Sequence, residues 1–326
     1  MAHIAIMARP ATRSRFKRLV TAHPLMSYFV IAFIGTWAFW LPVALSRVEH
    51  GLGLLPFAFS DGAMLLCLVL GGFAGPPVAA LTLTAMSSGR AGVGQLLRRC
   101  VAWRVGIQWY LIIVFSFLVI FLVGFSIVYA VNLPQAFMAR WTLIFTMFVP
   151  ITVISILKAN FAEEVGWRGF ALPRLQGRYG PIAGTINLGA LHSLWHLPLF
   201  FTAQLGPSSL PHFAGFVGAG IALTMLYTWL FNHTRGSVLL ATLAHGCSNG
   251  ALPVVGLLIP ADLVVHGWAA PLVYGGWNGD LLVVIGGAAV LLLVFTRGQL
   301  GYKLEQNAQL SATRPPTVPS VPLAHR

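Results

Sequence analysis

The sequence predicts an all-α protein, a polytopic membrane helical bundle of about eight transmembrane helices. Its 326 residues are 57% hydrophobic and only 8% charged, whereas a soluble domain carries roughly 25% charged residues. The apolar residues also gather into runs near the length of about 20 residues that a helix needs to cross a bilayer. Because lipid offers no partner to an open backbone group, each such run is expected to be helical.

Eight apolar runs define the expected transmembrane bundle, which occupies residues 25–297. The first four runs cover residues 25–45, 62–86, 105–131 and 141–157, and the last four cover residues 181–201, 213–231, 237–259 and 281–296. A stretch rich in glycine and proline at residues 71–77 predicts a break or a kink in the second run.

The basic residues lie in alternate gaps between these runs. Arginine and lysine cluster before the first run and after the second, fourth, sixth and eighth runs, and the other loops hold most of the acidic residues. In this assignment residues 158–180 form a cytoplasmic loop that contains Lys158, Arg168, Arg174 and Arg178. By the positive-inside rule, both termini of the bundle are expected in the cytoplasm.

The segments that flank the bundle are polar. Residues 1–24 form a basic segment expected in the cytoplasm, and residues 298–326, rich in Pro, Ala, Ser and Thr, predict a disordered cytoplasmic tail. The net charge of +13 comes from the ends and short gaps, a pattern that favours anionic membrane lipids as partners and not nucleic acid. The expected location is the plasma (cytoplasmic) membrane. The three cysteines fit neither a disulfide framework nor a zinc knuckle.

Two adjacent carboxylates, Glu163 and Glu164, lie outside the pattern of acidic loops. On a helix, Glu164 and Arg168 lie one turn apart on one face, while Glu163 points about 100° away from Glu164. The two glutamates are therefore expected to have different roles. The alternative is a surface cluster at the cytoplasmic leaflet, where glutamate and arginine pair weakly.

Two further polar pairs occur in apolar runs at the spacing of one helical turn. His192 and His196 can bind a metal or act as acid and base, or can simply form hydrogen bonds inside the bundle. His245 and Asn249 can donate hydrogen bonds to a developing oxyanion, or can bond between helices. Together with Glu163, these groups can activate water and stabilise a tetrahedral intermediate, and peptide hydrolysis is the simplest chemistry that needs them.

The order of these motifs resembles a known family. Glu163-Glu164-x-x-x-Arg168, then a position four residues before His196, then His245-x-x-x-Asn249 resemble the CAAX-processing and bacteriocin-processing (CPBP) intramembrane proteases, which include the type II CAAX prenyl endopeptidases. The family-like core covers about residues 140–258, and its helical membrane fold agrees with the fold expected above. The sequence contains no His-Glu-x-x-His motif and no Gly-x-Ser-Gly motif.

The resemblance implies a role for each matching residue. Glu163 would activate the attacking water with His196, and His245 and Asn249 would hold the oxyanion or orient the substrate. Glu164 and Arg168 would order the first motif. The substrate would be a membrane-bound or lipid-anchored protein or peptide. The family is called a metalloprotease, although a metal-free glutamate mechanism has also been argued for it. Glu163, His196 and His245 could form a three-ligand zinc site with an open fourth position.

His192 departs from the family pattern, which has an aromatic residue four positions before the motif histidine. It could support a neighbouring catalytic group, act as an extra ligand or replace a packing residue, and we favour the first. The depth of the site also raises a question. In a run that begins at residue 181, His196 would lie about 22 Å along the helix. Glu163 must then lie deeper than the loop assignment implies, or the fifth run must begin later or be broken.

Two other functions fit the same residues. A non-catalytic membrane transporter, chaperone or immunity-type protein could use the Glu/His cluster to bind a ligand or protons. A protease scaffold that has lost its activity is the second, although every matching motif residue is present. The sequence favours the intramembrane endopeptidase.

Overall fold

A computed structural model describes residues 20–47, 51–202, 205, 209–260, 263 and 279–311, and these residues are almost entirely helical. The α-helices are α2 (Pro24–Leu45), α3 (Asp61–Ala74), α4 (Pro76–Cys100), α5 (Ile107–Tyr129), α6 (Leu133–Ala139), α7 (Val149–Ser155), α8 (Phe161–Gly166), α9 (Leu172–Trp195), α10 (Leu210–His233), α11 (Val238–Gly256), α14 (Gly279–Phe295) and α15 (Leu304–Ser311). π-Helical turns cover Ile144–Phe148, Ile156–Asn160 and Trp167–Ala171, and a 3-10 helix covers Leu197–Phe201.

The helices confirm a multi-pass membrane protein. Within the described ranges, six stretches are long and apolar enough to cross a bilayer, namely Pro24–Leu45, Asp61–Cys100, Ile107–Tyr129, Ile144–Phe201, Leu210–His233 and Val238–Gly256. All eight predicted apolar runs coincide with helices, and two of the six stretches are long runs in which several helices follow one another. The number of eight crossings and the cytoplasmic position of the termini stay predictions.

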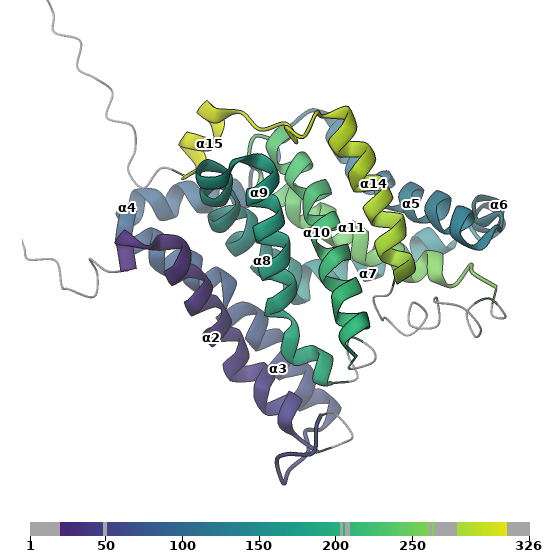
Figure 1. Cartoon of the computed structure of the whole chain (residues 1–326), viewed down its shortest axis with the longest axis horizontal. Helices are drawn as coiled ribbons and strands as arrows, with labels where there is room; N and C mark the ends of the chain where they lie inside the picture. Colours follow the sequence, from purple (N-terminus) through teal and green to yellow (C-terminus); the bar gives the residue numbers. More distant parts are fainter. Residues whose placement is uncertain are drawn as a thin grey trace, which may run out of the picture.

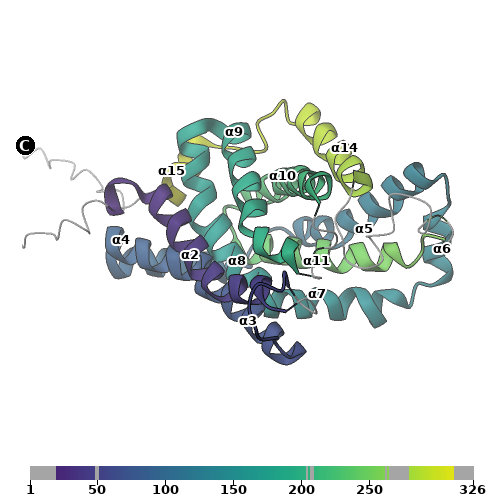
Figure 2. The same ribbon diagram turned by 60° about the horizontal axis from the view of Figure 1, so that its bottom comes forward.

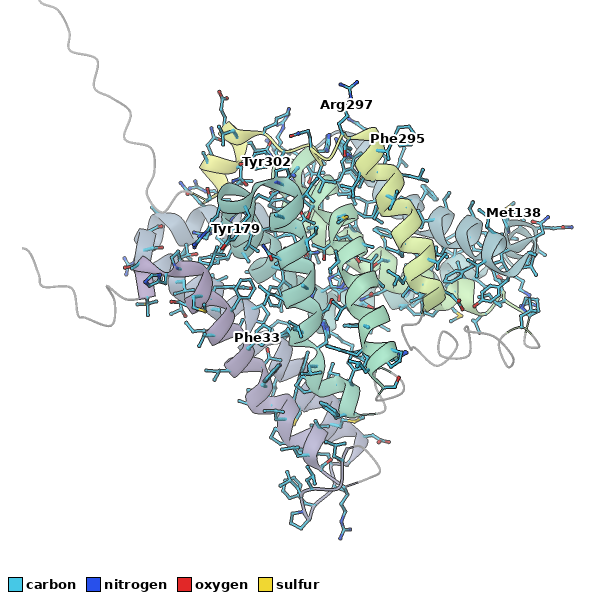
Figure 3. The ribbon with its side chains drawn as sticks, viewed as in Figure 1. Phe33, Met138, Tyr179, Phe295, Arg297 and Tyr302 are labelled. Carbon is cyan, nitrogen blue, oxygen red and sulfur yellow. The ribbon has the colours of Figure 1, made fainter. Side chains whose placement is uncertain are left out.

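The helices form two packed groups with the central helices α8 to α11 between them (Figures 1 and 2). Figures 1 and 2 show α2, α3 and α4 on one side of the molecule and α5, α6 and α14 on the other, with α8 to α11 between. One apolar core is built mainly from α5, α10, α11 and α14, and the other from α2, α4 and the helical run around α9. The outer surface is also apolar, and Met138 and Phe295 point outward in Figure 3. The two cores hold the polar residues of α8, α9 and α11 at their junction.

The predicted break in the second run is confirmed. α3 ends at Ala74 and α4 begins at Pro76, with Gly75 between them. A Cβ atom at Gly75 would lie 2.0 Å from Thr36 Oγ1 on α2, so only glycine permits this close approach of the two helices. Thr36 also donates a 2.7 Å hydrogen bond to the carbonyl of Gly71. The break at Gly75 therefore lets α3 and α4 pack closely against α2.

The prediction that residues 158–180 form a loop is wrong. These residues continue the helical run, through α8 and a π-helical turn into α9. Arg168 is fully buried, while Lys158 and Arg178 are exposed. Charge alone suggested a loop, but the charge of Arg168 is neutralised inside the protein by Glu164. Glu163 consequently lies on a helix in the interior of the protein and not in a loop.

The helical run bends within α9 at Gly180. This residue has φ 80° and ψ 173°, a conformation that is essentially restricted to glycine, and Pro181 follows it. Helical geometry resumes after the bend, close to the start of the fifth predicted run. The polar first part of α9 and its apolar second part therefore run in different directions.

Replacing Gly180 with alanine is expected to destabilise the fold by about 1–3 kcal/mol. No atom lies within 4 Å of the Cβ position, so the cost comes from the backbone conformation and not from a clash. Gly287→Ala is the control, because Gly287 lies inside α14 with equally open space and without a positive φ. Midpoints of denaturant unfolding in detergent measure both variants. Equal midpoints for the two would show that Gly180 carries no special backbone requirement.

The predicted disordered tail begins with ordered structure. Residues 304–311 form α15, which packs against α9. Asn307 Nδ2 donates a 2.9 Å hydrogen bond to the carbonyl of Pro173, and Gln306 Nε2 donates one of 2.9 Å to the carbonyl of Asn232. Polar contacts to distant carbonyls thus fix a helix that has no apolar periodicity. Residues 1–19 and 312–326, on which the other terminal predictions fall, lie outside the described residues.

Candidate active site

Glu163 is the carboxylate of a compact cluster with two histidines. It lies on α8, buried, and its Oε2 atom is 2.8 Å from His192 Nε2 on α9. His196 ends α9, and its Nδ1 atom is 3.1 Å from the carbonyl oxygen of His192. A carbonyl oxygen only accepts, so the Nδ1 atom of His196 carries a proton. In the neutral ring, its Nε2 atom then keeps a lone pair for water, a proton or a metal.

Aromatic rings surround His196 and keep this cluster in apolar surroundings. The ring centroid of His196 lies 4.7 Å from that of Trp195, 5.9 Å from that of Trp40 and 5.6 Å from that of Phe216. These residues come from α9, α2 and α10. Charge–charge and hydrogen-bond interactions are stronger where such rings displace water.

Glu164 faces away from Glu163 and forms a separate network. Its Oε1 atom accepts a 2.8 Å hydrogen bond from Arg168 Nη1 and lies 2.9 Å from His245 Nδ1 on α11. The side chains of Glu164 and Arg168 are both fully buried. Arg168 also lies over the ring of Tyr227, with its Cζ atom 4.9 Å from the centroid. A carboxylate only accepts, so Nδ1 of His245 donates, and the ring is held in one orientation.

The third predicted pair, His245 and Asn249, lies on one face of α11. Asn249 Nδ2 donates a 3.3 Å hydrogen bond to Asn160 Oδ1. Tyr227 lies against the ring of His245, with 5.4 Å between the centroids, and its hydroxyl is hydrogen-bonded to Ser248. Tyr227 on α10 therefore packs against the ring of His245, and Asn160 holds the side chain of Asn249.

One cavity of about 520 Å³ collects the predicted residues. Glu163, His192, His196, His245 and Asn249 all line it, and its walls come from α2, α3, α7, α8, α9, α10 and α11. Glu164 and Arg168 lie outside this lining, behind His245. The structure therefore divides the predicted residues into five at the cavity and two that support them.

The π-helical turns on both sides of α8 help to explain this division. They cover Ile156–Asn160 and Trp167–Ala171, immediately before and after the helix that carries both glutamates. A π-turn contains an extra residue and rotates the following side chains relative to a regular α-helix, and such turns are frequent at functional sites. The regular helical period had nevertheless predicted that Glu163 and Glu164 point apart and that Glu164 pairs with Arg168, and the structure agrees with both.

The sequence pattern did not single out two residues that line the cavity, Asn160 and Tyr227. Asn160 is buried and its Nδ2 atom has no hydrogen-bond partner among the described residues, although it lies beside Asn249. A polar residue one turn before Glu163 was the available signal for it. Tyr227 also lines the cavity. It could have been found from the sequence because Tyr227 and Thr224 are polar residues on one face of an apolar run.

The group of residues that could hold a metal differs from the set implied by the family resemblance. Glu163, His192 and His196 offer three ligand atoms that all lie within 4.8 Å of one another. His245 instead bonds to Glu164, which turns its Nδ1 atom away from this group. His192 therefore takes the place assigned to His245. One carboxylate oxygen and two imidazole nitrogens are ligands typical of a catalytic zinc site.

The site residues lie in the part of the chain that is similar to known proteins. Residues 143–251 match the family model described as type II CAAX prenyl endopeptidase Rce1-like. CAAX prenyl protease 2 of Methanococcus maripaludis is 34% identical to this chain over 109 residues, which are 32% of this chain and 40% of that protein. The chain thus spans less than half the length of this relative. α2 to α6, α14 and α15 lie outside the residues matched by the family model.

Proposed function

We propose that this chain is an intramembrane endopeptidase, because its central segment is similar to CAAX-processing proteases of the CPBP type. The observation that carries the proposal is the convergence of Glu163, His196, His245 and Asn249 on one cavity inside a helical membrane bundle. The substrate is a membrane-bound or lipid-anchored protein or peptide. The protein acts in the plasma membrane.

Glu163 is the general base of the proposed reaction. It removes a proton from water, whose oxygen then forms a bond to the scissile carbonyl carbon. His192 Nε2 donates a 2.8 Å hydrogen bond to Glu163 Oε2 and so orients the carboxylate. His196, with its Nδ1 proton held by the carbonyl of His192, presents Nε2 to the water.

His245 and Asn249 stabilise the oxyanion of the tetrahedral intermediate. Asn249 offers an amide donor at the cavity. His245 is oriented by the hydrogen bond of its Nδ1–H to Glu164, and its Nε2 atom donates to the oxyanion when it also carries a proton. The intermediate collapses as the carbon–nitrogen bond breaks, and Glu163 returns its proton to the leaving amine. Glu164 and Arg168 act as positioning residues, because they reach the reaction only through His245.

The cavity walls favour a substrate that arrives from the lipid. Leu65 on α3 and Ile154 on α7 line the cavity and are 44% and 53% exposed on the outer surface. An apolar wall at this position accepts a lipid-anchored or membrane-embedded chain more readily than a soluble peptide. Lys158, also exposed, provides a positive charge at the same wall.

The proposal is tested by cleavage of prenylated and unprenylated membrane peptides by the purified full chain in detergent. His196→Ala should lose cleavage. His233→Ala is a matched control, since its Nδ1 atom also bonds the carbonyl four residues earlier, at 2.9 Å, but on the exposed end of α10. Equal cleavage by both variants would remove His196 from the site. Solute transport that depends on Glu163 without any peptide cleavage would favour the non-catalytic alternative.

A zinc ion fits the donor set of Glu163, His192 and His196. Bound there, it would supply Lewis-acid activation of water. His192 Nε2 donates a 2.8 Å hydrogen bond to Glu163, and ligation of a metal by this nitrogen requires the loss of its proton. The cluster can therefore exist as a hydrogen-bonded pair or as a metal site, and the two states compete.

His192→Phe, which restores the aromatic residue of the family pattern, is expected to weaken zinc binding by at least about 100-fold. The variant removes one of three ligands and keeps an aromatic ring against Trp167, whose centroid is 4.8 Å from that of His192. Zinc content of the purified protein by elemental analysis, with His233→Phe as the control, measures the effect. Equal zinc content in His192→Phe and wild type would exclude His192 as a ligand. Cleavage that survives a chelator in both proteins would support the metal-free mechanism.

A further inference from the structure

Two hollows on the outer surface, away from the cavity, adjoin each other along α2. The first, of about 760 Å³, lies between the start of α2, the first part of α9 and the end of α15. The second, of about 570 Å³, is a groove along the outward face of α2. Both are lined by Phe29 and Leu191, so the hollows are continuous. Figure 3 shows Tyr179 on the side of α15 and Phe33 lower down on α2.

The first hollow is positively charged. Arg174 and Arg178 line it with His23, and no acidic side chain lines either hollow among the described residues. Neither arginine takes part in any of the ion pairs found in the described ranges. Arg174 lies 3.7 Å from the ring centroid of Phe170 and bonds its carbonyl, while its Nε atom is buried without a partner in the same ranges. An anion would neutralise this charge.

The second hollow is apolar. Val30, Phe33, Ile34, Trp37, Ala38 and Leu41 line it. From Phe29 to Leu41 the groove runs about 18 Å along α2 at about 1.5 Å per residue, slightly more than half of the roughly 30 Å hydrocarbon core of a bilayer. That length matches one acyl chain in one leaflet. The charged end is the larger of the two hollows, at about 760 Å³.

We propose that these two hollows form a binding site for one anionic glycerophospholipid. Its phosphate lies between Arg174 and Arg178, and one of its acyl chains lies in the groove of α2. The combination of a charged end and an acyl-length groove selects this ligand over a zwitterionic lipid, because the positive charge at the head has no acidic neighbour in the lining. The lipid would clamp α2 to α9, and α9 carries His192 and His196.

Native mass spectrometry of the full chain, purified in detergent, tests the proposal by titration with phosphatidylglycerol and phosphatidylcholine of the same acyl chains. Wild type should bind phosphatidylglycerol more tightly. Arg178→Gln should lower that affinity by about fivefold, since one cation near a phosphate contributes about that much. The affinity for phosphatidylcholine should fall less, because its ammonium group already opposes binding at the positively charged end. Arg178 is chosen because it is exposed, whereas Arg174 also donates a hydrogen bond to the carbonyl of Phe170 in the π-helical turn before α9.

Arg104→Gln is the matched control for the charge. Arg104 is also exposed and lies over a neighbouring ring, at 5.3 Å from Trp103, as Arg178 lies at 5.2 Å from Tyr179. Ala38→Trp should fill the groove and lower the affinity for both lipids, with Val290→Trp on α14 as its control. Equal affinities of wild type for the two lipids, or equal effects of Arg178→Gln and Arg104→Gln, would overturn the proposal. Unchanged binding by Ala38→Trp would also overturn it.

Discussion

Glu163→Gln is expected to lower the rate of peptide cleavage by about 10²–10⁴-fold, the contribution typical of a general base. Glutamine has the shape of glutamate, and its amide oxygen can still accept the hydrogen bond from His192 Nε2 that spans 2.8 Å in the structure. The packing around the site is therefore preserved while the ability to take a proton from water is lost. Initial rates with a cleavable membrane peptide measure the effect.

Glu305→Gln is the control for this substitution. Glu305 lies in the first turn of α15 and is exposed, outside the lining of the cavity. The Glu305→Gln protein should cleave the peptide at the wild-type rate. A Glu163→Gln protein that keeps wild-type folding and a rate within a few-fold of wild type would exclude Glu163 as the base, whatever the family resemblance implies.

Arg168→Met is expected to destabilise the protein by about 3–5 kcal/mol. The substitution leaves the charge of Glu164 fully buried with His245 as its remaining partner, because both side chains of the Glu164–Arg168 pair are inaccessible to solvent. Methionine fills most of the volume of the arginine, so the loss comes from the charge and not from a cavity. Denaturant unfolding in detergent measures the change in the free energy of unfolding.

The double variant Glu164→Gln/Arg168→Met separates stability from activity. It removes both charges, and its stability should recover a large part of the loss of the single variant. Its cleavage rate should stay low, because the glutamine amide can accept from Nδ1–H of His245 but lacks the negative charge of the carboxylate. Arg104→Met, an exposed substitution, should change stability by no more than about 0.5 kcal/mol. A double variant as unstable as Arg168→Met would show that the buried charge of Glu164 is not the cause.

The class of fold follows from the sequence alone. An apolar chain of this length has lipid as its solvent, and lipid leaves the helix as the favoured structure for each apolar run. The break near residues 71–77 was also predicted, because glycine and proline act on their own turn of the chain. These features depend on residues that are close together in the sequence, so they can be predicted from the sequence alone.

The sequence also singled out the residues that now line the cavity. Glu163, His192, His196, His245 and Asn249 are ionisable or polar residues in apolar surroundings, where each is costly and so stands out. Their roles in catalysis are still proposals. Asn160 and Tyr227 escaped notice because an asparagine or a tyrosine in a membrane helix is much less unusual than a charge.

Tertiary structure alone decided how these residues pair. His192 meets Glu163 across 29 positions of sequence and His245 meets Glu164 across 81, so no periodicity within one helix could assign the partners. The same applies to the helix at residues 158–180, which the charge of Arg168 had suggested was a loop, and to α15, which Asn307 fixes against Pro173. Local pattern determines which segments are helices in a membrane. The choice of partner for a buried charge is made by packing between helices, because only there can the cost of its desolvation be repaid.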